Sequence, residues 1–243
     1  ASADGARSVF AADLDGDGDL DVLSASVGDD KIAWYENLGS DFGDAPLPYP
    51  TTLAEDGARH IVTGLMLGAT RDEETDGTHS AAADADGADE DAVTFGTMMV
   101  GTLDATVTVN VQGSAGKLDG WIDFNGDGSW GGPGEQIAGS VTVVNWNNTI
   151  RFDVPSSVVG RVTFARFRLS TAGNLGISGA ADDGEVEDHQ DTIHSATPAT
   201  GEFSAKLTVS SAVSAAYSVF TSDVNGDGDV DVLSAAWGSR TFT

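Results

Sequence analysis

The chain has 243 residues, of which 40% are hydrophobic, so it is long enough and apolar enough to form a substantial core. Its 39 Asp and Glu against 11 Lys and Arg give a formal net charge of −28, which repels nucleic acid and anionic membrane surfaces and excludes both as partners. The absence of Cys excludes disulfides, thiolate zinc sites and cysteine nucleophiles. No segment approaches the ~20 consecutive apolar residues of a membrane helix, so we expect no membrane insertion.

An acidic ladder, DLDGDGDLD, lies near the amino terminus between two apolar runs of strand type. Its carboxylates fall on alternate positions, and the intervening glycines allow the curvature that turns them toward one point. Carboxylates so close together repel one another unless a hard cation lies among them, and Ca²⁺ takes about six to eight oxygen ligands. A solvated acidic turn is the alternative interpretation. The predicted calcium ligands are Asp13, Asp15, Asp17, Asp19 (through its backbone carbonyl) and Asp21.

Residues 41–92 have no regular apolar pattern and are rich in small, acidic and Gly residues. Their one good apolar patch is HIVTGLMLGA, residues 60–69. Long stretches of this kind are unusual inside a compact domain. We therefore expect either a long loop held in place by a ligand or a partly disordered segment.

The apolar pattern alternates with a period of two over most of the remaining chain. Val, Thr and Phe alternate with polar residues in these runs, and Gly is frequent between them, which is typical of antiparallel strands with one solvated face. No convincing helix is predicted, so the fold class is all-β. The expected strands are residues 107–113, 140–144, 149–154 and 161–170.

Another acidic loop, WIDFNGDGSWGGPGEQI, follows the expected strand at residues 107–113. We call it the third acidic loop, because a second copy of the ladder lies near the carboxyl terminus. Asp123, Asn125 and Asp127 keep the spacing of the ladder, the Ser129 carbonyl takes the next position, and Glu135 is thirteenth. An EF-hand would continue into a helix, which GGPGEQI cannot form. We predict a calcium site here, and a tight Asn-Gly-Asp-Gly hairpin turn is the alternative.

A second copy of the ladder lies 210 residues after the first, in SVFTSDVNGDGDVDVLSAA, residues 218–236. Joining Gly39 directly to Gly201 would restore a repeat of about 50 residues, the size of a propeller blade. Residues between the two copies therefore read as an insertion, and we predict domains at 1–39, 40–198 and 199–243. The predicted ligands of the second ladder are Asp223, Asn225, Asp227, Asp229 and Asp231.

The two end segments resemble the FG-GAP or VCBS-like repeats of integrin-type β-propellers, on the motif D-x-[DN]-x-D-G-x-x-D that both copies contain. The resemblance covers about 80 of the 243 residues. It implies partial β-propeller-type repeats whose acidic loops hold structural calcium. The full propeller is implied for a larger parent protein.

The inserted segment resembles the GEVED domain of secreted bacterial proteins. The strings that carry this resemblance are DFGDAP (41–46), GARH (57–60), LGATRDEETDG (67–77), DGADEDAVTF (86–95), TFARFRLS (163–170) and DDGEVEDH (182–189). It implies an antiparallel β-sandwich-like module of large extracellular proteins, with no catalytic activity. His189 stands where the family usually has an aromatic residue, which leaves the packing there open.

Acidic strings outside the three loops allow two interpretations. In a compact fold the acids of 41–44 would meet those of 185–188 and could form a fourth metal site. Alternatively, these acids pair with Arg166 or Arg168. The acids of 84–91 have the same two interpretations.

No catalytic motif stands out. The four His residues lack zinc spacing, and a glycosidase carboxylate pair cannot be recognised against 39 acids. We therefore expect a non-catalytic, calcium-binding, secreted structural or cell-adhesion module, part of a larger surface or filament assembly whose partners are calcium, neighbouring repeats or other copies, and extracellular glycans. A carbohydrate-binding module is the alternative, with Trp121, Trp130, Trp146 and Trp237 as candidate stacking residues.

Overall fold

The computed structural model describes residues 3–16, 20–85, 91–196, 208–211, 214–222 and 231–236. Within these ranges the fold is all-β, as predicted, with one turn of 3-10 helix, η1 (Leu53–Glu55), and no α-helix. Among the described residues, no helix has the length and hydropathy to cross a membrane. Six of the calcium ligands predicted in the two ladders lie outside the described ranges: Asp17, Asp19, Asp223, Asn225, Asp227 and Asp229.

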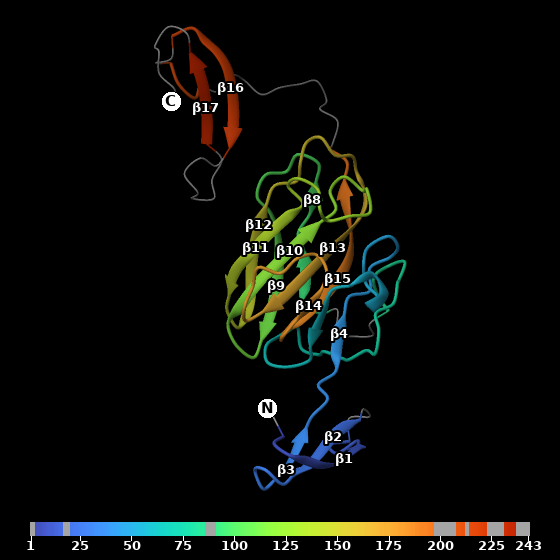
Figure 1. Ribbon diagram of the computed structural model, residues 1–243. Coiled ribbons are helices and arrows are strands. Elements are labelled where there is room, and N and C mark those ends of the chain that lie inside the picture. The colour runs from blue at the N-terminus through green and yellow to red at the C-terminus, as the bar shows by residue number, and fades with distance from the viewer. Residues whose placement is uncertain are drawn as a thin grey trace.

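The two ends of the chain form hairpins with the same strand pairing. Strands β1 (Ala6–Ala12), β2 (Asp21–Ser26) and β3 (Lys31–Tyr35) make an antiparallel sheet, and β16 (Ala216–Ser222) pairs with β17 (Asp231–Ala236). The pairs Ala12↔Asp21 and Ser222↔Asp231 are equivalent at an offset of 210 residues, and both hairpins have an irregularity after their first pair. Both lie outside the central body (Figure 1).

The larger sheet of the central body has the order β11-β10-β13-β15-β8. All its neighbours are antiparallel except β15 and β8, which are parallel. Strands β13 and β15 form its longest continuous pairing, from Arg161↔Ile193 to Leu169↔Glu185. Its strands are β8 (Met98–Met99), β10 (Gly116–Ile122), β11 (Gln136–Val143), β13 (Arg161–Ser170) and β15 (Glu185–His194).

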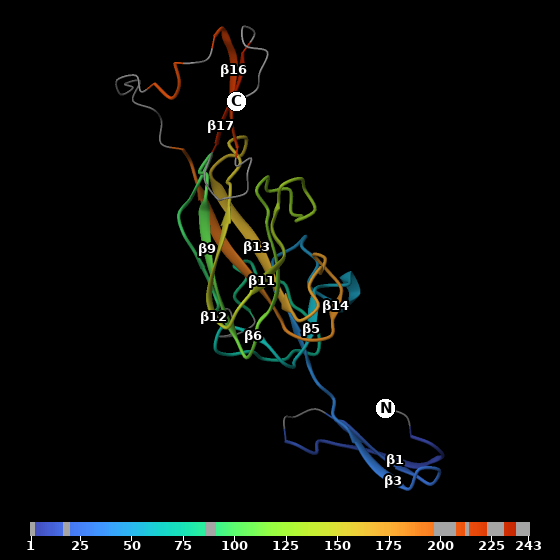
Figure 2. The ribbon, with the colours of Figure 1, turned by 90° about the vertical axis from the view of Figure 1, so that its left-hand side faces the viewer.

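The second sheet has the order β12-β9-β6, with β7 also pairing with β9. Its central strand shows the predicted alternation, because Ala105, Val107, Val109 and Val111 are buried while the residues between them are half-buried. Figure 2 shows β9 and β12 on one side of β13. Its strands are β6 (Met66–Leu67), β7 (Val93–Phe95), β9 (Ala105–Gln112) and β12 (Trp146–Phe152).

One apolar core joins these two sheets. Val107, Val109 and Val111 from β9 belong to the same buried cluster as Leu118 from β10 and Phe167 from β13. Burial of each large apolar side chain stabilises the fold by about 1.5–3 kcal/mol. Both sheets are thus held by a shared hydrophobic interior.

The irregular stretch after β3 is packed along this body. It contains β4 (Ser40–Phe42) and β5 (Arg59–Ile61), which form a small sheet with β14 (Ala180–Ala181). Phe42, Leu65 and Leu67 are almost completely buried. The described residues 40–85 are therefore an ordered part of the body, and the short strands within them were not expected from the sequence.

We expect residues 40–198 to fold when expressed alone, because the core that joins the two sheets is built from residues 65–193. Thermal unfolding of this piece should be a single cooperative transition with loss of near-ultraviolet circular dichroism. The full chain provides the control. A gradual transition with rapid proteolysis of the piece would contradict the proposed boundaries.

Candidate metal centre

The third acidic loop connects β10 to β11, and backbone hydrogen bonds close both of its ends. Ile122 donates its N–H to the Glu135 carbonyl at 2.9 Å, and Asp123 donates its own to the Phe164 carbonyl at 3.0 Å. Gly126 and Gly128 have φ of +70° and +81°, a region that favours glycine. The loop therefore leaves and re-enters the sheet at a fixed point while its tip curls back.

This curl brings three carboxylates together. Asp123, Asp127 and Glu135 each place one oxygen so that all three lie within 4.8 Å of one another. Asp123 and Glu135 are buried, and Asp127 is exposed. Burial raises the pKa of Glu135, and the nearby charges of Asp123 and Asp127 raise it further.

One oxygen of this group has no hydrogen-bond partner. Glu135 Oε2 accepts the Gly132 N–H at 2.6 Å, whereas Glu135 Oε1 is buried and has no donor in hydrogen-bond geometry among the described residues, although the Asn125 backbone N–H lies near enough to lower the pKa of the carboxyl. A buried carboxylate oxygen without a partner is costly, and a bound cation is one standard explanation. The donor set consists of oxygen atoms, the ligand type that calcium prefers, so these residues fit a calcium ion.

Asn125 and Ser129 lie within the same turn as Asp127. Asp127 donates its backbone N–H to Asn125 Oδ1 at 2.7 Å, and Asn125 Nδ2 donates to Asp127 Oδ2 at 3.0 Å. Ser129 donates its N–H to Asp127 Oδ1 at 3.0 Å. Such local bonds also occur in an ordinary Asx turn, so the burial and unpaired oxygen of Glu135 carry the argument for a metal.

Tyr49 ties this loop to the irregular segment. Its hydroxyl donates to Asp123 Oδ2 at 2.5 Å, and its ring stacks on Trp130 with centroids 4.2 Å apart. Burial raises the pKa of Tyr49, and the hydrogen bond to Asp123 adds to the shift. Tyr49 was not predicted, because it lies 74 residues from Asp123 in a stretch without a local pattern.

The first ladder is described only in part. Asp13 Oδ1 accepts the Gly16 N–H at 2.6 Å, which begins the expected curl. Asp21 is fully buried and accepts the N–H groups of Leu14 at 3.0 Å and Asn37 at 2.8 Å. Asp15 lies in the bend between them.

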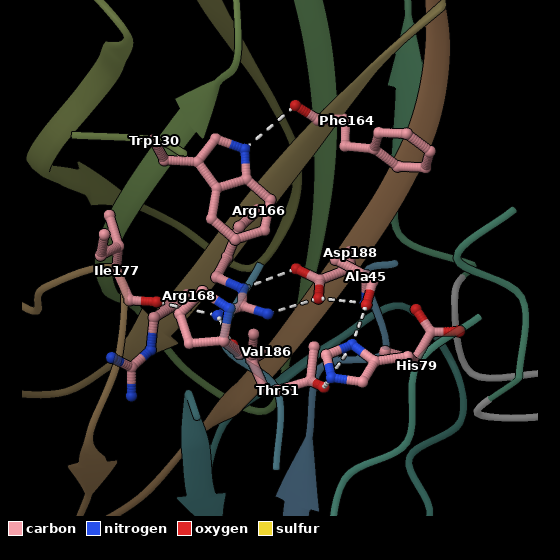
Figure 3. A network of polar contacts seen from close by, with 12 residues as sticks. Ala45, Thr51, His79, Trp130, Phe164, Arg166, Arg168, Ile177, Val186 and Asp188 are labelled. Atoms are coloured by element: carbon pink, nitrogen blue, oxygen red, sulfur yellow. Dashed lines mark hydrogen bonds and ion pairs between the residues drawn. The ribbon is translucent and has the colours of Figure 1, made fainter. Parts of the chain in front are cut away.

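The acids at the two ends of the inserted segment do meet, as the sequence suggested. Asp188 forms a two-bond ion pair with Arg166, at 2.7 and 2.6 Å, and both side chains are inaccessible to solvent (Figure 3). Asp188 also accepts the Ala45 N–H at 2.9 Å. Pairing with Arg166 is thus confirmed for Asp188.

Arg166 has further partners that lock it in place. Its Nη1 donates to the carbonyls of Pro50 and Ile177, both at 2.8 Å, and its guanidinium lies 4.5 Å from the centre of the Trp130 ring. A guanidinium satisfied on every side can be buried without a large net penalty. Trp130, which lies within the third acidic loop, is thereby fixed to the centre of the sheet.

The other acids of this group accept backbone N–H groups from distant segments. Asp41 accepts from Val186, Glu185 accepts from Leu67, both at 2.7 Å, and Glu187 accepts from Ala92 at 3.2 Å. Gly184, which precedes them, has φ of +94° and lies against the Leu169 carbonyl, so a side chain there would collide with the backbone. Among the described residues, these acids serve as cross-links, and the group close enough to hold a metal is Asp123, Asp127 and Glu135.

His189 fills the position of the expected aromatic residue. Its ring lies edge-on to Phe95 and Phe167, with centroids 6.4 and 6.2 Å away, and its Nε2 lies 2.9 Å from Glu187. The imidazole therefore packs as an aromatic ring and holds one of the buried acids.

The contacts of His60 with Arg168 and Asp183 show why His60 is unsuited to a metal role. His60 Nε2 accepts a hydrogen bond from Arg168 Nε at 3.0 Å, and its Nδ1 lies 2.7 Å from the Asp183 carbonyl. Burial, followed by the Arg168 charge, lowers the pKa of His60 well below its usual value. Both ring nitrogens are engaged, so His60 is a neutral structural residue.

Asp44 is a buried carboxylate that is only half satisfied. Asp44 Oδ2 accepts the Ala85 N–H at 2.5 Å, while Oδ1 has no hydrogen-bond partner among the described residues. Burial raises the pKa of Asp44 to about 6, and the charges of Asp188 and Asp84 contribute to the shift. The ionised form of Asp44 therefore destabilises the folded protein at neutral pH.

Comparison with known families finds a match to the GEVED domain over residues 117–192. This span contains the third acidic loop, Arg166 and Asp188, and it confirms the predicted resemblance for that part of the chain. The resemblance of the end segments to FG-GAP repeats stays a prediction. Neither a curated protein nor a solved structure matches the chain significantly.

Replacing Asp188 by Asn should destabilise the protein by about 3–5 kcal/mol, because Arg166 would remain buried without a counter-charge. Asp182→Asn, at an exposed position between β14 and β15, is the matched control and should change stability by under about 0.5 kcal/mol. Urea denaturation measures both. A cost below about 1 kcal/mol for Asp188→Asn would contradict the central role of the pair.

Asp44→Asn should change the pH dependence of stability. Because the folded-state pKa of Asp44 is raised to about 6 from 3.8, its stabilising contribution is complete below pH 3.8 and is lost as the pH rises through 6. The stability of Asp44→Asn relative to wild type should therefore increase from pH 4 to pH 7, by roughly 1–2 kcal/mol after solvent screening.

This pH effect is measured as the difference between the urea denaturation free energies of the two proteins across the range. The difference cancels the contributions of the many other acids. A constant difference would show that Asp44 has an ordinary pKa.

Proposed function

We propose that this protein is a non-catalytic, calcium-stabilised structural or adhesive module of a large extracellular bacterial protein. The observation that supports it best is the cluster of Asp123, Asp127 and Glu135, with its buried and unpaired Glu135 oxygen. Three carboxylates at this separation in a chain of charge −28 favour a divalent cation. A donor set made of oxygen atoms favours calcium over zinc or copper.

The proposed coordination sphere combines local and returning ligands. Asp123, Asn125 and Asp127 supply side-chain oxygens, Ser129 supplies a carbonyl, and Glu135 closes the site from the start of β11. An ion held this way joins the two ends of the loop through protein oxygens. It would thereby stabilise the β10–β11 hairpin and the position of Trp130.

The matching pairing of the two end hairpins supports equivalent calcium sites there. Asp21 and Asp231 begin β2 and β17 at the same place in the hairpin. The end sheets also leave large apolar side chains exposed, among them Phe10, Ile32 and Phe220. Repeats of this kind need neighbours to bury such faces, which supports partial β-propeller-type repeats within a larger protein.

The inserted segment is proposed to be a β-sandwich-like module. Two sheets share one core, and the buried acids tie the irregular segment to it. These acids accept hydrogen bonds from backbone N–H groups or from Arg166. This supports a structural role for them and a module without catalytic function. Calcium at the millimolar level outside cells is suited to sites of moderate affinity, which supports an extracellular location.

The alternative carbohydrate-binding function loses two of its candidate residues. Trp121 and Trp130 are buried, with Trp130 Nε1 donating to the Phe164 carbonyl at 3.0 Å. Trp146 is 64% exposed, and Trp237 lies outside the described residues. The other exposed tryptophan among the described residues, Trp34, lies on β3 of the amino-terminal sheet, so no two of them are shown to form one stacking platform and this function is the weaker proposal.

Calcium should raise the melting temperature of the full chain relative to chelator. At a hundredfold excess over the dissociation constant each site adds ~2.7 kcal/mol, which corresponds to several degrees at ~2–4 °C per kcal/mol. Melts are recorded in millimolar calcium, in chelator, and in chelator with excess magnesium. Coincidence of the calcium and chelator melts within about a degree would overturn the proposal.

Glu135→Gln should raise the melting temperature in chelator and reduce the further increase that calcium produces. In chelator the neutral side chain relieves burial of an unpaired charge and repulsion from Asp123 and Asp127, so the variant should melt higher than wild type. In calcium it should gain less than wild type, because one charged ligand is lost. Asp182→Asn, which removes an exposed charge, should shift neither melt.

A further inference from the structure

A hollow of about 310 Å³ lies beside the third acidic loop, residues 123–135, which is called the metal loop from here on. It is bounded by the segment Pro46–Tyr49 on one side, by the start of β13 on another, and by Gly126 and Gly128 of the loop. Its size suits a group as large as a monosaccharide or an amino-acid side chain. The acidic cluster and the hollow share Asp123.

The hollow has an apolar side and a cationic side. Pro46, Leu47 and Pro48 form the apolar side, with Leu47 69% exposed. Arg161 provides the positive charge in a chain with few cations. Its Nη1 donates to the Asn125 carbonyl at 2.5 Å, but its Nε is buried and has no acceptor among the described residues.

The walls of the hollow are fastened to the metal loop. A Cβ added to Gly126 would lie 1.7 Å from Arg161 Nη1, and one added to Gly128 would lie 2.5 Å from Pro48. Tyr49 binds Asp123 from the same side. The shape of the hollow therefore depends on the conformation of the loop.

We propose that this hollow binds a carboxylate carried on a small organic group. The carboxylate pairs with the guanidinium of Arg161, which lines the hollow next to the loop, and the organic part packs along Pro46–Pro48. A guanidinium donor in a partly desolvated hollow favours an ionised oxygen acceptor, and the apolar wall favours a carboxylate with a carbon body over a bare inorganic anion. Binding is strengthened by calcium, a feature that rests on the proposed function.

The test uses the full chain and two matched ligand pairs at constant ionic strength. Butyrate is compared with butyramide, and glucuronate with glucose, so that each pair differs in its carboxylate while the carbon body is kept. Nuclear magnetic resonance follows the Arg161 Nε–H and the amides of Gly126 and Gly128, in calcium and in chelator. We expect saturable shifts with the carboxylates only, tighter in calcium, and the two pairs distinguish an aliphatic from a sugar carboxylate.

Arg161→Gln removes the positive charge and should weaken carboxylate binding about tenfold or more, as expected for loss of a charged hydrogen bond. Arg151→Gln removes the same charge from an exposed position on β12 and should leave binding unchanged. Equal binding of the neutral analogues, stronger binding of inorganic phosphate than of butyrate, no saturation, or no effect of Arg161→Gln would overturn the proposal.

Calcium binding is measured separately by calorimetry, so that the two proposals fail independently. Carboxylate binding without any calcium binding would refute the calcium module and the calcium dependence, while leaving the hollow as a carboxylate site. Calcium binding with no carboxylate response would refute the hollow and leave the module intact.

Discussion

Arg166 and Asp188 lie directly opposite each other in β13 and β15, and both are shielded completely from water. Two charges in such a place are tolerated only when every donor and acceptor is satisfied. That requirement brings Pro50, Ile177 and Ala45 to the pair, and Trp130 onto the guanidinium. This one contact therefore links the facing strands β13 and β15, the irregular segment at Ala45 and Pro50, and the third acidic loop at Trp130.

Two groups of acidic residues in the central body have different surroundings. Those near β15 are used as acceptors for backbone N–H groups, as Asp41 is for Val186, and they need no cation. Those of the loop after β10 face one another, and Glu135 keeps an unpaired buried oxygen. Part of the negative charge of the central body is thus engaged in internal hydrogen bonds, and three further carboxylates face one another where a cation would neutralise them.

The end hairpins show how a repeated sequence leads to repeated structure. Their strands pair identically although the inserted body separates them, because alternating apolar residues and a tight acidic turn determine a hairpin locally. Their exposed Phe10 and Phe220 are equivalent positions of the two copies. The inserted body instead carries its own core and its own loop, with Tyr49 and Arg161 binding that loop from outside it.

The sequence by itself determined the all-β class, the strands around residues 107–113 and 161–170, and the clustering of Asp123, Asp127 and Glu135, since these follow from short-range alternation and loop spacing. It did not indicate β10 or β15, because Asp119, Glu185 and Asp188 are buried charges that break the alternation of a strand with one solvated face. The roles of Tyr49 and Arg161 and the choice between metal binding and ion pairing for Asp188 were decided by tertiary structure. Those depend on contacts between residues far apart in the chain, where burial selects the partner and no local pattern records it.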